Sequence, residues 1–172
     1  PDAQRTMLSS AGATRHLDAA FLNPDDITNC DALVMSAYSL IGGLQREYAV
    51  KALDIAKRAG LTTFIDMGSG AVNALQDRLI SLTQDFDYLL MNQKELLTLT
   101  GASSISEAVN GLAHDGIKRV IVKVGEKGSM VITPEITDLI EAYEIDNAID
   151  STGAGDYYTA AFAHGIMEGY DL

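Results

Sequence analysis

Short apolar runs alternate with segments of helical spacing along most of this 172-residue chain. The strand-like runs cover residues 32–38, 62–68, 88–92 and 119–125. The segments with helical spacing cover residues 44–60, 71–82, 93–101 and 104–116. Strands that alternate with helices of this length predict βαβ units. We therefore expect an α/β fold of three layers, in which a mostly parallel sheet lies between helices.

Several local signals mark where the expected helices begin and end. Gly60 and Gly101 each follow a helical segment and are expected to end it. Ser104 is followed three residues later by Glu107, which is a capping-box pattern at a helix start.

The pattern changes after residue 125. The segments GEKGSMVIT and DLIEAYEI resemble two strands joined by a turn around Pro134, and a helix is expected from about Gly153. The chain contains no repeat, no low-complexity segment and no Pro-rich linker. We therefore expect one domain over residues 1–172.

Composition restricts the classes of partner. The net charge of −12 argues against nucleic acids and anionic membranes. No apolar run approaches the roughly 20 residues that a membrane span needs. The single cysteine, Cys30, excludes an internal disulfide framework and a Cys-based zinc cluster, and it is expected to be a quiet, partly buried thiol. A reducing cytoplasm is the expected compartment, and the acidic charge does not argue against a nucleotide ligand bound at a local phosphate site.

Polar residues occur where the expected strands end. They are Asp66, Asn92, Lys123 and Asp150. In parallel α/β sheets, ligands bind beyond the carboxyl ends of the strands. One polar residue at such an end means little, but four of them indicate one edge of a site.

A cluster of small residues, Gly153-Ala154-Gly155, precedes the last expected helix. Free backbone N–H groups and the helix dipole make a glycine-rich helix start a candidate anion cradle, although a tight strand-to-helix turn would use the same glycines. Asp156 follows at once, and acids are also favoured in first turns by the dipole alone. If a hydroxyl lies between the Asp156 carboxylate and the anion, the carboxylate can accept the proton of that hydroxyl, and the backbone N–H groups can hold the negative charge of the phosphoryl group. These are the two tasks that phosphoryl transfer requires.

The sequence DSTGAGD at 150–156 resembles the second signature of the pfkB, or ribokinase-like, family of carbohydrate and nucleoside kinases. Ser151 stands where Thr is usual. The stretches RTMLSSAGA at 5–13, MNQKE at 91–95 and VKVGEKGSMV at 122–131 resemble further family motifs in the expected order. The resemblance covers nearly all of the chain and implies a Rossmann-like, ribokinase-like fold.

The resemblance implies a role for each residue of the glycine cluster. Asp156 would be the catalytic base that acts on a sugar or nucleoside hydroxyl. Gly153, Ala154 and Gly155 would form the anion hole for the phosphate transferred from ATP. Asp150 and Thr152 match positions that in many members help to form a monovalent-cation site, for which K⁺ is a candidate.

The resemblance also assigns nucleotide and metal roles. Glu95 would organise Mg²⁺, through water, and Asn92 would contact the same region. Lys123, Gly125 and Gly128 would line the nucleotide groove. Taken from spacing alone, Asn92 and Glu95 fit a helix cap with a first-turn acid, Lys123 fits an edge-strand lysine in solvent, and the two glycines fit an ordinary turn.

The chain also departs from the family pattern. Nothing corresponds to the Gly-Gly-rich start and the small β lid, and the chain stops about one helix after Asp156. After the strand at 62–66 the sequence is DMGSGAV, which keeps Asp66 but lacks the Asn and Arg that are frequent there. We therefore expect a fragment truncated at both ends, whose uncovered sheet edges would invite association, with a homodimer as a candidate.

Two other functions compete with a kinase. A dinucleotide-binding oxidoreductase is disfavoured, because Tyr158 occupies the third glycine position of the G-x-G-x-x-G fingerprint. A catalytically silent nucleotide-binding or regulatory relative is favoured by the missing lid and disfavoured by the intact Asp156.

Overall fold

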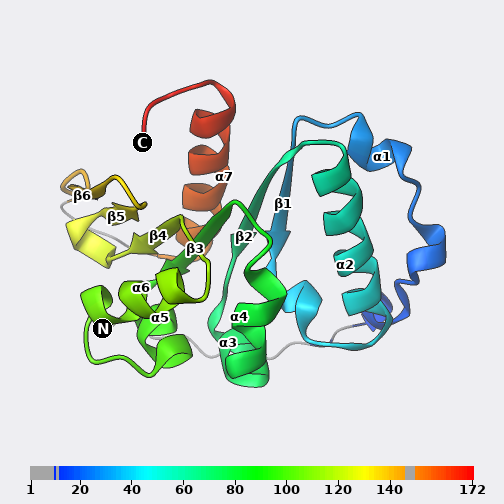
Figure 1. Ribbon diagram of the computed structural model, residues 1–172, viewed down its shortest axis with the longest axis horizontal. Helices are drawn as coiled ribbons and strands as arrows, with labels where there is room; N and C mark the ends of the chain where they lie inside the picture. Colours follow the sequence, from blue (N-terminus) through cyan, green and yellow to red (C-terminus); the bar gives the residue numbers. More distant parts are fainter. Residues whose placement is uncertain (1–9, 11, 146–149) are drawn as a thin grey trace.

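The computed structural model of the chain describes residues 10, 12–145 and 150–172. Most of the family-like stretch at 5–13 therefore lies outside the described residues. Six strands form one sheet in sequence order (Figure 1). They are β1 (Ala32–Ser36), β2 (Thr62–Asp66), β3 (Tyr88–Asn92), β4 (Val120–Lys123), β5 (Ser129–Ile132) and β6 (Thr137–Ile140). Strands β1 to β4 are parallel, and β5 and β6 are each antiparallel to the preceding strand.

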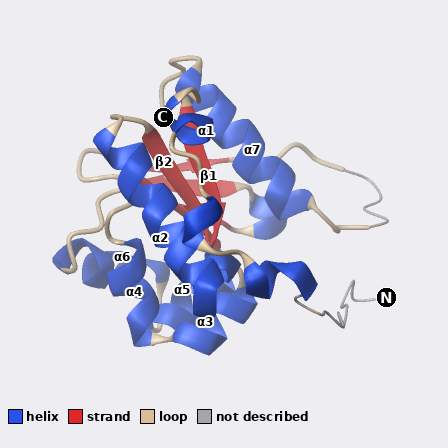
Figure 2. Cartoon of the chain, turned by 90° about the vertical axis from the view of Figure 1, so that its right-hand side faces the viewer, coloured by secondary structure: helices blue, strands red, loops and turns tan. Residues whose placement is uncertain are grey.

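Helices cover both faces of the sheet (Figure 2). The α-helices are α1 (Asp25–Thr28), α2 (Gly43–Arg58), α3 (Ser69–Leu75), α4 (Asp77–Thr83), α5 (Gln93–Thr100), α6 (Ile105–His114) and α7 (Ala154–Met167). Four 3₁₀ turns are η1 (Gly12–His16), η2 (Ala19–Phe21), η3 (Ala37–Leu40) and η4 (Gly125–Lys127). Helices α2 to α6 lie on one face and α7 lies on the other. The three-layer α/β prediction is confirmed.

Each face of the sheet has its own apolar core. Alternate strand residues point to opposite faces, so a strand covered on both sides needs a continuous apolar run. Ile65, Leu89 and Val122 pack among the helices α2 to α6. Phe64 and Ile121, their neighbours in sequence on β2 and β4, pack toward α7. The unbroken apolar runs of the central strands thus follow from burial on two sides.

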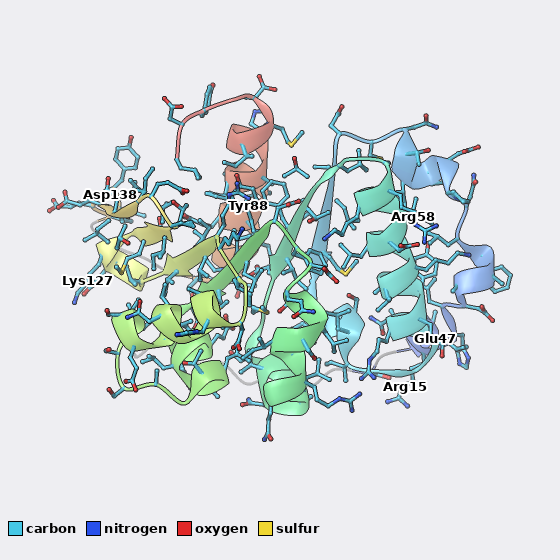
Figure 3. The ribbon with its side chains drawn as sticks, in the orientation of Figure 1. Arg15, Glu47, Arg58, Tyr88, Lys127 and Asp138 are labelled. Atoms are coloured by element: carbon cyan, nitrogen blue, oxygen red, sulfur yellow. The ribbon has the colours of Figure 1, made fainter. Side chains whose placement is uncertain are left out.

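Aromatic side chains dock α7 on the sheet. Phe64 and Tyr88 stack with their ring centroids 5.0 Å apart, and Phe162 of α7 meets Tyr88 edge-on at 5.6 Å. Figure 3 labels Tyr88 beside this helix. Arg119 lies over the Tyr88 ring at 5.3 Å. Burial against the sheet also raises the pKa of Tyr158, a shift that a hydrogen bond with Ser129 partly offsets. The aromatic contacts hold α7 against the sheet.

The expected helix at 71–82 is two helices. Gln76 separates α3 from α4 with a φ of 45°, the one positive φ of a non-glycine residue in the described part of the chain. Its N–H still bonds to the carbonyl of Val72, so α3 closes normally before the chain turns. Leu75 and Leu79 remain buried on either side of the break. The apolar spacing could not indicate this turn, because no Gly or Pro marks it.

The expected helix-ending glycines are confirmed, and several strands are shorter than expected. Gly60 follows the C-cap of α2 with a φ of 76°, and Gly101 caps α5 in the left-handed conformation. The turn around Pro134 joins β5 to β6, as expected. Strand β6 ends at Ile140, however, and residues 141–145 are not strand. Strand β5 begins only at Ser129, because Gly125–Lys127 form η4. Cys30, expected to be partly buried, is exposed.

The capping box expected at α6 is only half formed. The Ser104 hydroxyl accepts a hydrogen bond from the Glu107 N–H at 3.2 Å, which is the expected N-cap bond. The Glu107 carboxylate bonds instead to the N–H and hydroxyl of Ser103, at 2.9 and 2.7 Å. These bonds lower the pKa of Glu107, mainly through the Ser103 hydroxyl.

We expect an NMR titration to find the pKa of Glu107 below the usual glutamate range. Hydrogen bonds to the ionised carboxylate favour its charged form, so they stabilise the folded state above the unfolded pKa, and this stabilisation is lost as the pH falls through the folded pKa. Ser103→Ala should raise the pKa partway, because the Ser103 N–H remains. Ser104→Ala, which removes only the N-cap hydroxyl, should leave the pKa nearly unchanged. Equal pKa values in wild type and Ser103→Ala would contradict this assignment.

Candidate functional site

Three of the four predicted strand-end residues lie at one edge of the sheet. Asp66, Asn92 and Lys123 are the last residues of β2, β3 and β4. These strands are parallel, and Asn92 is directly opposite Lys123. The residues just before Asp150 lie outside the described ones. Asp150 itself lies in a turn, where its Oδ1 accepts the Thr152 N–H at 2.8 Å.

Lys123 is not the solvated edge-strand lysine that spacing alone would allow. Strand β4 lies between β3 and β5, and the Lys123 side chain is only 17% exposed. Its Nζ forms an ion pair of 2.8 Å with Oδ1 of Asp66, reaching across the end of β3. The other carboxylate oxygen, Oδ2, accepts the Thr159 hydroxyl of α7 at 3.0 Å. One carboxylate therefore connects β2, β4 and α7.

The glycine cluster starts α7, as predicted. Gly153 is the N-cap residue with a φ of 79°, a conformation that favours glycine. A Cβ on Gly155 would lie 3.5 Å from Nζ of Lys123, so the ammonium group lies directly beside the first turn. Asp156 is in that turn and is exposed. The fold thus brings together Lys123, Gly155 and Asp156, which are far apart in the sequence.

The first turn of α7 has the electrostatics of an anion cradle. The early N–H groups of a helix have no carbonyl acceptor within it, and the dipole adds partial positive charge. The Ala154 N–H donates to the Ser151 carbonyl at 3.1 Å, so an incoming anion would compete for it. The second and third amides of the helix belong to Gly155 and Asp156. The Lys123 ammonium, which is paired with Asp66, lies beside them in a chain whose net charge is −12.

Asn92 and Glu95 form a complete capping box at the start of α5. The Asn92 side chain accepts the Glu95 N–H at 2.8 Å, and Oε2 of Glu95 accepts the Asn92 N–H at 2.9 Å. Glu95 is buried at 7% exposure, and its Oε1 accepts the Ser69 hydroxyl at 2.9 Å. The helix-cap interpretation is therefore confirmed. It leaves the predicted metal role of Glu95 open, because each carboxylate oxygen has a second lone pair.

Tyr38 packs on Gly68 and Gly70, which lie on either side of Ser69. Ser69 is the residue whose hydroxyl bonds to Glu95. A Cβ on Gly68 or Gly70 would come within 2.7 or 2.6 Å of the Tyr38 ring, and the Gly70 N–H donates to the Tyr38 hydroxyl at 3.2 Å. A small hollow of about 60 Å³ lies between α3 and α5. Its lining includes Ser69 and Glu95.

The two predicted nucleotide-site glycines serve the β4–β5 turn. Gly125 has a φ of 68°, and its carbonyl accepts a hydrogen bond from the Gly128 N–H at 3.0 Å. Gly128 has a φ of 105°, and a Cβ there would overlap the carbonyl oxygen of Ile140. Glycine at 128 is thus required by close backbone packing. Lys127 and Asp138, labelled in Figure 3, are exposed near this turn and on β6.

The described part of the chain contains no group of three or more His, Cys, Asp or Glu side chains placed to hold a metal ion. Mg²⁺ is commonly held by one or two carboxylates together with water and substrate phosphates, so Glu95 fits a water-mediated role. Among the same described residues, no helix is both long and apolar enough to cross a bilayer.

Three residues of this region were missed by the sequence analysis. Thr159, Ser69 and Tyr38 each bond to a strand-end or helix-start group. Their partners are 93, 26 and 32 residues away, so no local pattern could pair them. The only available signal was the place of Thr159 three residues after Asp156, which puts the two on neighbouring positions of one helix.

Comparison with known proteins gives a consistent assignment. A family model described as pfkB family carbohydrate kinase matches residues 1–172. A ribokinase from Arabidopsis thaliana is 31% identical over 181 residues, covering 98% of this chain and 44% of its own length. The chain thus spans about half the length of the curated relatives it matches.

Two solved structures have the same fold. An adenosine kinase from Sinorhizobium meliloti superposes with a TM-score of 0.85 at 24% identity, covering 92% of this chain and 49% of its own. A putative ribokinase II from E. coli, in complex with ATP and Mg²⁺, gives 0.81 at 24% identity, covering 91% of this chain and 52% of its own. The match along the whole sequence and the shared fold together place this chain in the pfkB family of carbohydrate kinases.

Proposed function

We propose that the protein carrying this chain transfers a phosphoryl group from ATP to a hydroxyl of a sugar or nucleoside. The observation that carries the proposal is the position of the Lys123 ammonium beside Gly155, in the helix turn that also bears Asp156. A base next to a cluster of donors is the arrangement that phosphoryl transfer requires. The E. coli structure with ATP and Mg²⁺ supports the choice of donor and metal.

Each residue then has one task. Asp156 accepts the proton of the acceptor hydroxyl as the oxygen attacks the terminal phosphorus. The amides of the Gly153–Gly155 segment and the Lys123 ammonium bind the phosphoryl oxygens, on which negative charge is spread in the transition state. Mg²⁺, when bound, would neutralise charge on the nucleotide phosphates. Glu95 would hold that ion through water, with Asn92 fixing the Glu95 carboxylate through the capping box.

The remaining assignments complete the proposed site. Gly125 and Gly128 shape the turn along which the nucleotide would lie. Asp150 and Thr152 would help to bind a monovalent cation such as K⁺ near the anion cradle. The acceptor is a small molecule, and the protein is proposed to work in the cytoplasm. A homodimer and a single domain over residues 1–172 stay predictions.

The test is an activity screen of the full-length protein. Purified protein, ATP and Mg²⁺ are incubated with a panel of sugars and nucleosides, and ³¹P NMR follows the formation of a phosphate monoester. We expect one class of acceptor to be phosphorylated at a rate well above ATP hydrolysis without acceptor. Nucleotide binding with no product on any acceptor would contradict the proposal and favour a catalytically silent relative.

A further inference from the structure

One carboxylate joins three elements that are distant in sequence. Asp66 at the end of β2 bonds through Oδ1 to Lys123 of β4 and through Oδ2 to Thr159 of α7. Thr159 is 4% exposed, and the Lys123 and Asp66 side chains are 17% and 20% exposed. The other two ion pairs of the described residues are far more exposed. A charge pair this sheltered interacts more strongly than one on an open surface.

The position of Thr159 on α7 links this cluster to Asp156. Residues three apart lie next to each other on a helix surface, so the bond to Asp66 holds the side of α7 adjacent to Asp156. The same carboxylate holds Lys123, whose ammonium lies beside Gly155 in that first turn. Asp66 therefore sets the distance between the positive charge of β4 and the first turn of α7.

We propose that Asp66 is a positioning residue for phosphoryl transfer, which fixes Lys123 and the first turn of α7 against each other through its two carboxylate oxygens. This inference rests on the proposed kinase function. In that reaction Asp66 touches neither ATP nor the acceptor, and it acts only through Lys123 and Thr159. Rates of such reactions depend steeply on geometry, since a displacement of about 1 Å can cost roughly a hundredfold in rate.

The chain offers a matched structural control at another point of the sheet. The Thr63 hydroxyl donates to Oδ2 of Asp87 at 2.8 Å, and Thr63 is fully buried. This bond joins β2 to the residue just before β3, away from α7. Thr63→Val and Thr159→Val thus each remove one buried hydroxyl bonded to an aspartate. Only the second removes a bond to the helix that carries Asp156.

The experiment compares these variants in the full-length enzyme, with ATP and the acceptor found in the screen. Thr159→Val is expected to lower kcat by about 10- to 100-fold, with the KM for ATP changed less than about threefold. The Thr63 hydroxyl also accepts the Asp87 N–H at 3.0 Å, so Thr63→Val should lower the urea midpoint at least as much as Thr159→Val. It should leave kcat within about twofold of wild type. Thr159→Ser keeps the hydroxyl and should restore most of kcat.

The outcomes separate this inference from the function on which it rests. If wild type transfers phosphate and Thr159→Val keeps its kcat, the positioning role is wrong and the kinase assignment stands. Equal kcat losses in Thr63→Val and Thr159→Val would also overturn it, because the effect would then follow stability alone. If wild type phosphorylates no acceptor, the proposed function fails and the inference fails with it.

Discussion

Replacement of Asp156 by asparagine is expected to lower kcat for phosphoryl transfer by about 10²- to 10⁴-fold. Asparagine keeps the size of the side chain but cannot accept the proton of the acceptor hydroxyl. The KM for ATP should change little, because the exposed Asp156 carboxylate is assigned to the acceptor. The measurement is steady-state kinetics of the full-length enzyme with the acceptor that the screen identifies.

The control for this variant is Glu168→Gln at the other end of α7. It removes one negative charge from an exposed side chain at the C-cap residue of the same helix. We expect its kcat to match wild type. Loss of the favourable first-turn charge in Asp156→Asn should cost only about 0.3–1 kcal/mol of stability. Equal turnover in wild type and Asp156→Asn would exclude Asp156 as the base.

The largest stability effect is expected from Gly128→Ala. A Cβ at this position would overlap the carbonyl oxygen of Ile140 and approach Ala142 N at 2.8 Å and Glu141 C at 2.9 Å. These are backbone atoms, so β6 would have to shift away from the β4–β5 turn. The positive φ of 105° adds a conformational cost to this overlap. We therefore expect Gly128→Ala to lower the free energy of unfolding by about 2–5 kcal/mol, measured by urea denaturation.

Gly125→Ala is the matched control for this effect. Gly125 also has a positive φ, 68°, but nothing lies within 4 Å of the Cβ it would gain. Only the conformational cost of about 1–2 kcal/mol should then appear. If the two variants lose the same stability, close packing against β6 does not explain the glycine at 128.

Periodicity and end signals predicted the sheet and most helices of this chain. The central strands β2 to β4 are apolar because helices cover both sides of them, and that burial is visible in the sequence as unbroken apolar runs. Gly60 and Gly101 marked helix ends for a local reason, namely the left-handed conformation they adopt. The turn at Gln76 had no such signal, and it divided an expected helix into α3 and α4.

The candidate site was predictable where strand ends and the glycine-rich start of α7 marked it in the sequence. Asp66, Asn92 and Lys123 were identified because parallel strands end at a common edge. Their partners were not predictable, because Lys123 pairs with the Asp66 carboxylate 57 residues away and Asp66 also accepts a hydrogen bond from Thr159 of the last helix. Such pairs depend on how α7 packs on the sheet. That packing depends on side-chain shapes rather than on sequence spacing.

The central claim is that phosphoryl transfer occurs where the ends of β2 to β4 meet the first turn of α7. The most direct measurement is a crystal structure of the full-length enzyme with ADP, Mg²⁺ and aluminium fluoride, which mimics a phosphoryl group in transfer. We predict the fluoride group within hydrogen-bond distance of the Gly155 amide and the Lys123 ammonium, with Asp156 facing it from the acceptor side. A fluoride group bound away from the α7 amino terminus would contradict the account.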